Sequence, residues 1–354
     1  MARSSKGIFV LAVVLLVTSL TVGCGSVETP GTTLTTSGPT TTAGPPTTAA
    51  ETSMNIAFFT FGKAIPAPLA AYGGAKRYAA QHNATVTLFD GQFSAPTQVA
   101  QLQDATTSGK YQVFIIQAND GTAVIPAVEA AIAKGIAVVA EFTPIGTRYD
   151  TGESQVEGMS YVGQNIAANG ELLAQLGLEA AESAGIAKPV IAYLQGMPAL
   201  PLDATRTKAA VAALEAGGAT VISSYVGGYS RDTGRQAGQD LFSSHPDVNI
   251  IIGGTPAIEG LETIIPEALK GKVLLIGNGP STQAVEAVQQ GRWYATAYWP
   301  EDVLGEKAAE IGLGVARGTM KPTSMTDIQI AEMLGLSPKG TKDNLVGVTG
   351  AYTD

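Results

Sequence analysis

The chain has 354 residues, of which 45% are hydrophobic and 14% charged, so it is long enough to bury two substantial cores. Its net charge of −9 argues against a nucleic-acid partner, because no basic stripe is present to contact phosphates. Its single cysteine excludes an internal disulfide.

The N-terminal segment begins with Arg3 and Lys6, continues with the apolar run IFVLAVVLLV and ends in small residues before Cys24. This pattern resembles a bacterial lipoprotein signal over residues 1–24, with Cys24 as the lipidated residue, although Thr21 stands where that signal prefers leucine. Ordinary secretory cleavage and a retained membrane helix are the alternatives. Residues 25–53 are rich in Thr, Pro and Gly, which predicts a disordered tether. No second apolar span of membrane length follows, so we expect a soluble body.

The next part of the chain alternates between strand and helix patterns. Apolar, β-branched runs predict strands at 55–61, 84–90, 112–117 and 136–142, with helices at 66–82, 95–108 and 122–134. The polar segment 143–157 then indicates an approach to a second domain.

A second series follows with the same spacing. We expect strands at 159–163, 189–195, 219–226, 248–253, 272–277 and 293–299, and helices at 166–184, 204–216, 231–244, 257–269 and 281–290. A helix over 301–317, a short strand near 326–331 and a loop-like end complete the chain. Two consecutive Rossmann-like units predict an α/β protein with two doubly wound parallel-sheet lobes and a cleft at the strands' carboxyl ends.

Arg206 stands out in this pattern. Asp203 is expected to be the N-cap of the helix after strand 189–195, which places Arg206 in the first helical turn. A cation there is mildly unfavourable beside the helix dipole, so it is expected to face a ligand or a carboxylate; a solvated surface arginine is the alternative. In a dry cleft it would need an acid such as Glu141, Asp203 or Glu259, or an anionic ligand.

Four stretches carry a resemblance to a known family: LQGMPALPLDATRTKAA, HPDVNIIIGG, VLLIGNGPSTQAVEAVQQGRWYATA and PEDVLGEKAAE. Over residues 54–335 the chain resembles the type I periplasmic sugar-binding proteins of ABC importers. The resemblance implies a three-segment hinge crossed near residues 158, 299 and 325. One lobe would then comprise 54–158 plus 300–325, and the other 159–299 plus 326–354.

The resemblance places the family's ligand-contacting arginine on Arg206 and its stacking aromatic on Tyr229. Its other contact positions fall on different residue types, namely Trp299, Ile65, Ala67, Pro68, Phe142, Thr143, Gly254 and Gly279. The resemblance therefore implies the architecture but not ribose as the ligand.

Sugar sites combine aromatic faces with forked hydrogen-bonding groups. On this basis ten residues are predicted to bind ligand: Arg206, Tyr229, Trp299, Tyr298, Phe61, Lys63, Phe142, Gln164, Asn165 and Asn278. For each of them a structural role in the core, at a helix cap or at the solvated surface is the alternative.

We therefore expect an extracytoplasmic, lipid-anchored, monomeric solute-binding protein that delivers a sugar or polyol to an ABC permease and needs no cofactor or metal. A sensory receptor for an anionic or nucleoside-like molecule is the alternative. An α/β enzyme is less favoured, because dinucleotide, phosphate-loop and serine-hydrolase motifs are missing and His82 and His245 are the only histidines. A DNA-binding regulator would need a helix-turn-helix where the signal stands.

Overall fold

The computed structural model describes residues 53–354. The expected signal, the lipidation at Cys24 and nearly all of the expected tether lie outside these described residues. Within residues 53–354, every helix is too short or too polar to cross a membrane.

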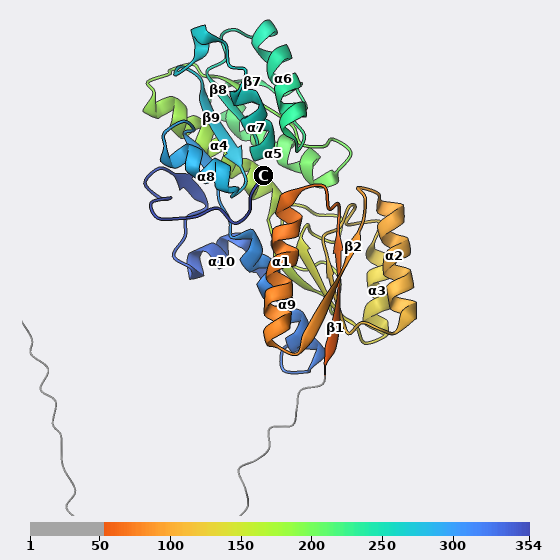
Figure 1. Ribbon diagram of the computed structural model, residues 1–354. Helices are drawn as coiled ribbons and strands as arrows, with labels where there is room; N and C mark the ends of the chain where they lie inside the picture. The colour runs from red at the N-terminus through yellow and green to blue at the C-terminus, as the bar shows by residue number, and fades with distance from the viewer. Residues whose placement is uncertain (1–52) are drawn as a thin grey trace, which may run out of the picture. The chain divides into compact units, whose positions relative to one another are not determined.

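The first lobe is built on a six-stranded parallel sheet with the order β11-β5-β4-β3-β1-β2 (Figure 1). Its strands are β1 (Met54–Thr60), β2 (Ala84–Asp90), β3 (Val113–Ile116), β4 (Ala137–Phe142), β5 (Ser160–Gly163) and β11 (Ser324–Thr326). Side chains alternate along these strands, so each face of the sheet needs its own cover. Helices α1 (Pro66–Gln81) and α9 (Glu301–Ala316) cover one face, and α2 (Ala95–Ser108) and α3 (Ile125–Ala133) cover the other.

The second lobe repeats this plan with the strand order β12-β10-β9-β8-β6-β7, in which only the edge strand β12 is antiparallel. The strands are β6 (Val190–Tyr193), β7 (Thr220–Ile222), β8 (Ile250–Gly254), β9 (Leu274–Asn278), β10 (Ala295–Ala297) and β12 (Lys339–Thr341). Helices α4 (Ile166–Ser183) and α5 (Pro201–Ala216) cover one face. Helices α6 (Arg231–Ser244), α7 (Thr255–Glu262) and α8 (Thr282–Gln289) cover the other, with the 3-10 turn η1 (Glu267–Leu269) after α7. The prediction of two doubly wound α/β lobes is confirmed.

The first crossing between the lobes lies later in the chain than expected. Strand β5 pairs with β4 and β11 in the first sheet, whereas the sequence analysis assigned residues 159–163 to the second lobe. The chain therefore crosses after Gly163, where α4 begins on the second sheet. A buried parallel strand has the same hydrophobic run in either sheet, so its pattern could not decide its lobe.

The last part of the chain also departs from expectation. The segment predicted as a strand near 326–331 forms helix α10 (Asp327–Met333), because Thr326 and Gln329 make a reciprocal capping box at its start. The loop-like end contributes the short strand β12, and its last residues return to α8, where the carbonyl of Tyr352 accepts from the backbone N–H of Thr282. The label C in Figure 1 marks this end at the junction of the two lobes.

Helix α9 is the element that returns from the second lobe, and it packs closely on α1. Gly74 of α1 and Gly305 of α9 allow this approach, since a Cβ on either would collide with the other helix's backbone at Asp302 and Ala71. The packing fixes the first turn of α9, including Glu301, at the junction of the lobes.

Candidate functional site

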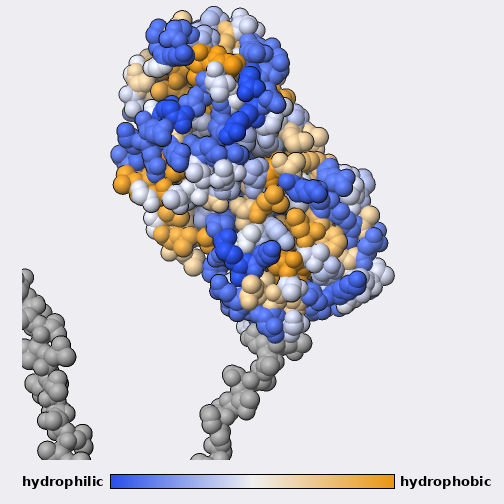
Figure 2. Space-filling model, in the orientation of Figure 1, coloured by the Kyte–Doolittle hydropathy of each residue, from blue (hydrophilic) through white to orange (hydrophobic). Residues whose placement is uncertain are grey.

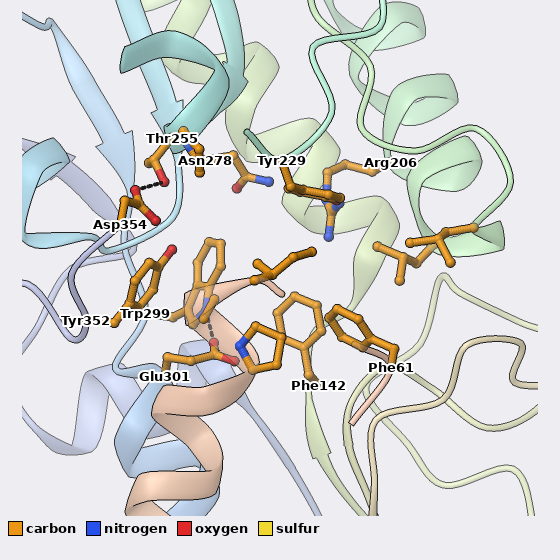
Figure 3. Close-up of a pocket in the computed structure, with 16 residues that line it drawn as sticks. Phe61, Phe142, Arg206, Tyr229, Thr255, Asn278, Trp299, Glu301, Tyr352 and Asp354 are labelled. Atoms are coloured by element: carbon orange, nitrogen blue, oxygen red, sulfur yellow. Dashed lines mark hydrogen bonds between the residues drawn. The ribbon is translucent and has the colours of Figure 1, made fainter. Parts of the chain in front are cut away.

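A cavity lies between the two lobes and contains about 610 Å³ of empty space, counting its mouth (Figure 3). Its wall is formed by Phe61, Ile65, Ala67, Pro68, Phe142, Leu200, Leu202, Arg206, Tyr229, Thr255, Pro256, Asn278, Trp299, Glu301, Tyr352 and Asp354. Figure 2 shows apolar residues, in orange and tan, reaching the surface where the lobes meet.

Aromatic rings form one wall of the cavity. The ring centroids of Trp299 and Phe142 lie 6.2 Å apart, and those of Phe142 and Phe61 lie 6.4 Å apart, with both pairs tilted. Trp299 is fixed by its indole N–H, which donates to Oε2 of Glu301 at 2.5 Å. Such rings can pack against the C–H faces of a sugar or polyol.

Phe142 reaches this wall through an unusual backbone conformation. Its φ is 61°, and the N–H of Thr143 donates to the carbonyl of Glu141 at 2.6 Å, which closes a tight turn around it. The carbonyl of Phe142 accepts from the N–H of Gln164 and from the hydroxyl of Tyr161. A left-handed conformation is strained for a bulky residue, and such strain is concentrated at functional sites.

Arg206 lies at one end of the cavity with 4% of its surface exposed. Its Nη1 contacts Oδ1 of Asp203 at 2.7 Å, and its Nε donates to Oδ1 of Asn169 at 2.6 Å. The hydroxyl of Tyr229 donates to the same Asp203 oxygen at 2.5 Å. The arginine charge is therefore balanced inside the protein, and the cavity does not require an anionic ligand.

Asp203 itself differs from expectation. Helix α5 begins at Pro201, with Leu200 as its N-cap, so Asp203 lies inside the first turn rather than at the cap. Proline is preorganised for the first helical position, which explains the earlier start. The second oxygen of Asp203 accepts from the N–H of Met197, so the carboxylate fixes the loop as well as Arg206.

The opposite end of the cavity is acidic. Glu301 is buried there, and Oδ2 of Asp354 accepts from the hydroxyl of Thr255 at 2.9 Å. Burial, followed by the nearby Glu141 carboxylate, raises the pKa of Glu301 well above its usual value. Sequence reasoning missed this end. Glu301 follows Trp299 by two residues and could have been suspected, whereas Tyr352 and Asp354 lie in a loop without a motif.

The ten expected residues fall into two groups. Six line the cavity: Arg206, Tyr229, Trp299, Phe61, Phe142 and Asn278. Asn278 also joins the arginine network, because its Oδ1 accepts from Nδ2 of Asn169 at 3.3 Å.

The other four are not among its lining residues. Tyr298 is buried in the second lobe, and its hydroxyl donates to the carbonyl of Thr349. Lys63 is exposed beside Asp90. Gln164 donates to Asp327 at the hinge, and Asn165 caps α4.

Buried carboxyl groups surround the hinge behind the aromatic wall. Oε2 of Glu141 accepts from Nε2 of Gln117 at 2.6 Å, and Oδ2 of Asp327 accepts from Nε2 of Gln164 at 3.0 Å. Burial raises the pKa of Glu141 to about 8 and that of Asp327 to about 6. Among residues 53–354 no cluster of His, Cys, Asp and Glu side chains is placed to hold a metal ion.

Comparisons with known proteins agree with this architecture. Residues 55–320 match the periplasmic binding protein domain family. The ribose import binding protein of Salmonella typhimurium is 24% identical over 246 residues, which cover 69% of this chain and 79% of that protein. The D-ribose/D-allose-binding protein of Pseudomonas aeruginosa is 23% identical over 285 residues, covering 77% and 80%.

Solved structures show the same fold. An ABC transporter solute-binding protein of Mycobacterium smegmatis with bound glycerol has a TM-score of 0.69 and 24% identity, covering 86% of this chain and 100% of that one. The Caulobacter myo-inositol binding protein, bound to myo-inositol, has a TM-score of 0.66 and 19% identity, covering 78% and 92%.

Proposed function

We propose that this chain, which belongs to the periplasmic binding protein family, captures a sugar or polyol between its lobes and delivers it to an ABC permease. The family consists of solute-binding proteins rather than enzymes. The observation that carries the choice of ligand is the cavity itself, which combines aromatic faces with an arginine whose charge Asp203 already balances. A hydroxyl-rich molecule without an anionic group fits this combination, and the ligands named for the relatives and fold neighbours are rich in hydroxyls.

Binding would act through the hinge. Phe61 and Phe142 belong to the first lobe and Arg206 and Tyr229 to the second, while Trp299 lies on a crossing segment. A solute that contacts both groups stabilises the closed arrangement of the lobes. The permease would then recognise the closed form.

The ligand class can be tested by thermal shift with the full chain against neutral sugars, polyols, nucleosides and organic acids. A neutral sugar or polyol at about a hundred times its dissociation constant should add roughly 2.7 kcal/mol of stability. Trp299→Ala should abolish this shift. Tyr294→Ala, at a partly exposed tyrosine outside the cavity, is the control that should keep it. The proposal is wrong if no sugar or polyol stabilises the protein.

The position at the envelope is a separate proposal that rests on the signal pattern before Cys24. A lipid on Cys24 would hold the body on the outer side of the cell membrane by the Thr/Pro/Gly-rich tether. In fractionated cells the wild-type protein should be found with membranes, and Cys24→Ala should release it. An unlipidated N-terminus by mass spectrometry would refute the anchor.

A further inference from the structure

The acidic side chains that line the cavity outnumber its basic side chains. Its charged lining residues are Arg206, Glu301 and Asp354. Arg206 is paired with Asp203, so it contributes little net charge to the ligand space. Within residues 53–354, neither Glu301 nor Asp354 forms an ion pair of its own.

A third acid, Glu259, lies behind Asp354, and the two side chains hydrogen-bond to each other. Oε2 of Glu259 also accepts from Nε of Arg231 at 2.7 Å. Among the described residues, Arg231 is therefore the single cation beside three acids, Glu259, Asp354 and Glu301. The neutral donors to the two acids that line the cavity are the Trp299 indole and the Thr255 hydroxyl.

Tyr352 lies near both acids that line the cavity. Burial, and then the carboxylates of Asp354 and Glu301, raise the pKa of its phenol well above the usual value, so both acids act on the same ring. Figure 3 shows Tyr352 beside Trp299, with Asp354 and Glu301 on either side of it. This end of the cavity thus presents two carboxyl groups and two aromatic rings.

We infer that, if the proposed function holds, the solute carries a protonated amino group in addition to its hydroxyls, and that this group binds at the acidic end between Glu301 and Asp354. Carboxylates give an ammonium group charge-assisted hydrogen bonds, and the faces of Trp299 and Tyr352 add cation–π attraction. An anionic solute is disfavoured by the same groups, since its charge would lie beside acidic side chains.

The remaining hydroxyls of such a solute have partners at the other end. Asn278 and Tyr229 lie beside the arginine network, and Phe61 and Phe142 cover the apolar side. Specificity is thereby divided along the cavity: the arginine end binds hydroxyls and the acidic end selects the charge.

Matched compounds test this directly by calorimetry on the full chain. Suitable pairs are D-glucose and D-glucosamine, D-galactose and D-galactosamine, D-mannose and D-mannosamine, and glycerol and 2-amino-1,3-propanediol, with D-glucuronate and D-galacturonate as anionic counterparts. In the pair that binds best, the amine should bind at least tenfold more tightly than its neutral parent, and the uronates should not bind. A neutral parent that binds as tightly as its amine overturns the inference but leaves the proposed function intact. Failure of every sugar and polyol to bind overturns both.

Substitutions at the acidic end test whether its carboxyl groups cause the preference for the amine over its neutral parent. Glu301→Gln and Asp354→Asn replace each carboxyl with an amide of nearly the same shape, and each should reduce at least fivefold the ratio of amine affinity to neutral-parent affinity, with both compounds measured on the same variant. Glu286→Gln, the same change at an exposed position of α8, should leave the preference unaltered. An amine preference that survives in both cavity variants contradicts the assignment of the acidic end.

Discussion

The two ends of the cavity differ in how many partners their buried charged side chains have. At the arginine end, Arg206 and Asp203 are both buried, and each makes several hydrogen bonds within the protein. At the acidic end, Glu301 is buried with the Trp299 indole as its recorded donor, and Glu141 lies behind it with one unpaired oxygen. The charged groups of the arginine end have their partners before any ligand binds. At the acidic end, a ligand can supply partners that the protein lacks, as is usual for a binding site.

The largest expected effect comes from removing the buried ion pair at the arginine end. Arg206→Ala leaves the Asp203 carboxylate buried without its cation, so the free energy of unfolding should fall by about 3–5 kcal/mol. Urea denaturation measures this. Arg235→Ala is a matched control, because Arg235 forms the same i,i+3 pair with Asp232 on an exposed helix face, where the loss should stay below about 1 kcal/mol. Equal losses in the two variants would mean that burial of the Arg206 pair is unimportant.

The arginine end was largely predictable from sequence because its signal is local. A buried strand, a Gly/Pro loop and a helix within about twenty residues indicate a ligand-facing arginine at the strand's carboxyl end. The partner Asp203 is three residues away, within one helical turn, so it could be named as a candidate acid. Phe61, Phe142 and Trp299 were predicted as aromatic faces for a sugar, Trp299 with help from the family resemblance, and they lie at or just after strand ends.

The acidic end was not predictable because tertiary contacts create it. Asp354 reaches the cavity only because its backbone pairs with Gln283 of α8, and Tyr352 pairs with Thr282. Nothing in a loop-like tail reveals such a partner some seventy residues away. The prediction of Tyr298 was wrong for the converse reason. Tyr298 is aromatic and adjacent in sequence to Trp299, but its hydroxyl bonds within the second lobe.

At the acidic end, removing a charge should raise stability, and the effect should depend on pH. The folded protein holds the proton of Glu141 up to a pKa of about 8, whereas the unfolded chain releases it near 4.5. Between these values the folded state binds more protons, so stability falls as the pH rises through this window. Glu141→Gln should therefore be more stable than the wild type at pH 8, on the order of a few kcal/mol, and nearly equal to it at pH 4.5.

Thermal denaturation of both proteins across this pH range measures the difference. Glu182→Gln, at an exposed position of α4, should follow the wild-type curve. The raised pKa values of Glu301 and Asp327 act in the same direction, so the variant should reduce the slope without removing it. A Glu141→Gln protein that is less stable than the wild type at pH 8 would show that the ionised carboxylate is stabilising.

The smallest expected effect concerns Phe142, the strained residue in the aromatic wall of the cavity. Phe142 has a φ of 61°, so a residue without a Cβ should fit its backbone better than alanine. Both truncations lose the ring, and therefore Phe142→Gly should be more stable than Phe142→Ala by about 1 kcal/mol. At Phe61, whose φ is not positive, the order should be reversed. If urea denaturation shows alanine to be the more stable residue at both positions, the left-handed turn does not hold Phe142 in the cavity wall, and the ring must be fixed by its contacts with Trp299 and Phe61 alone.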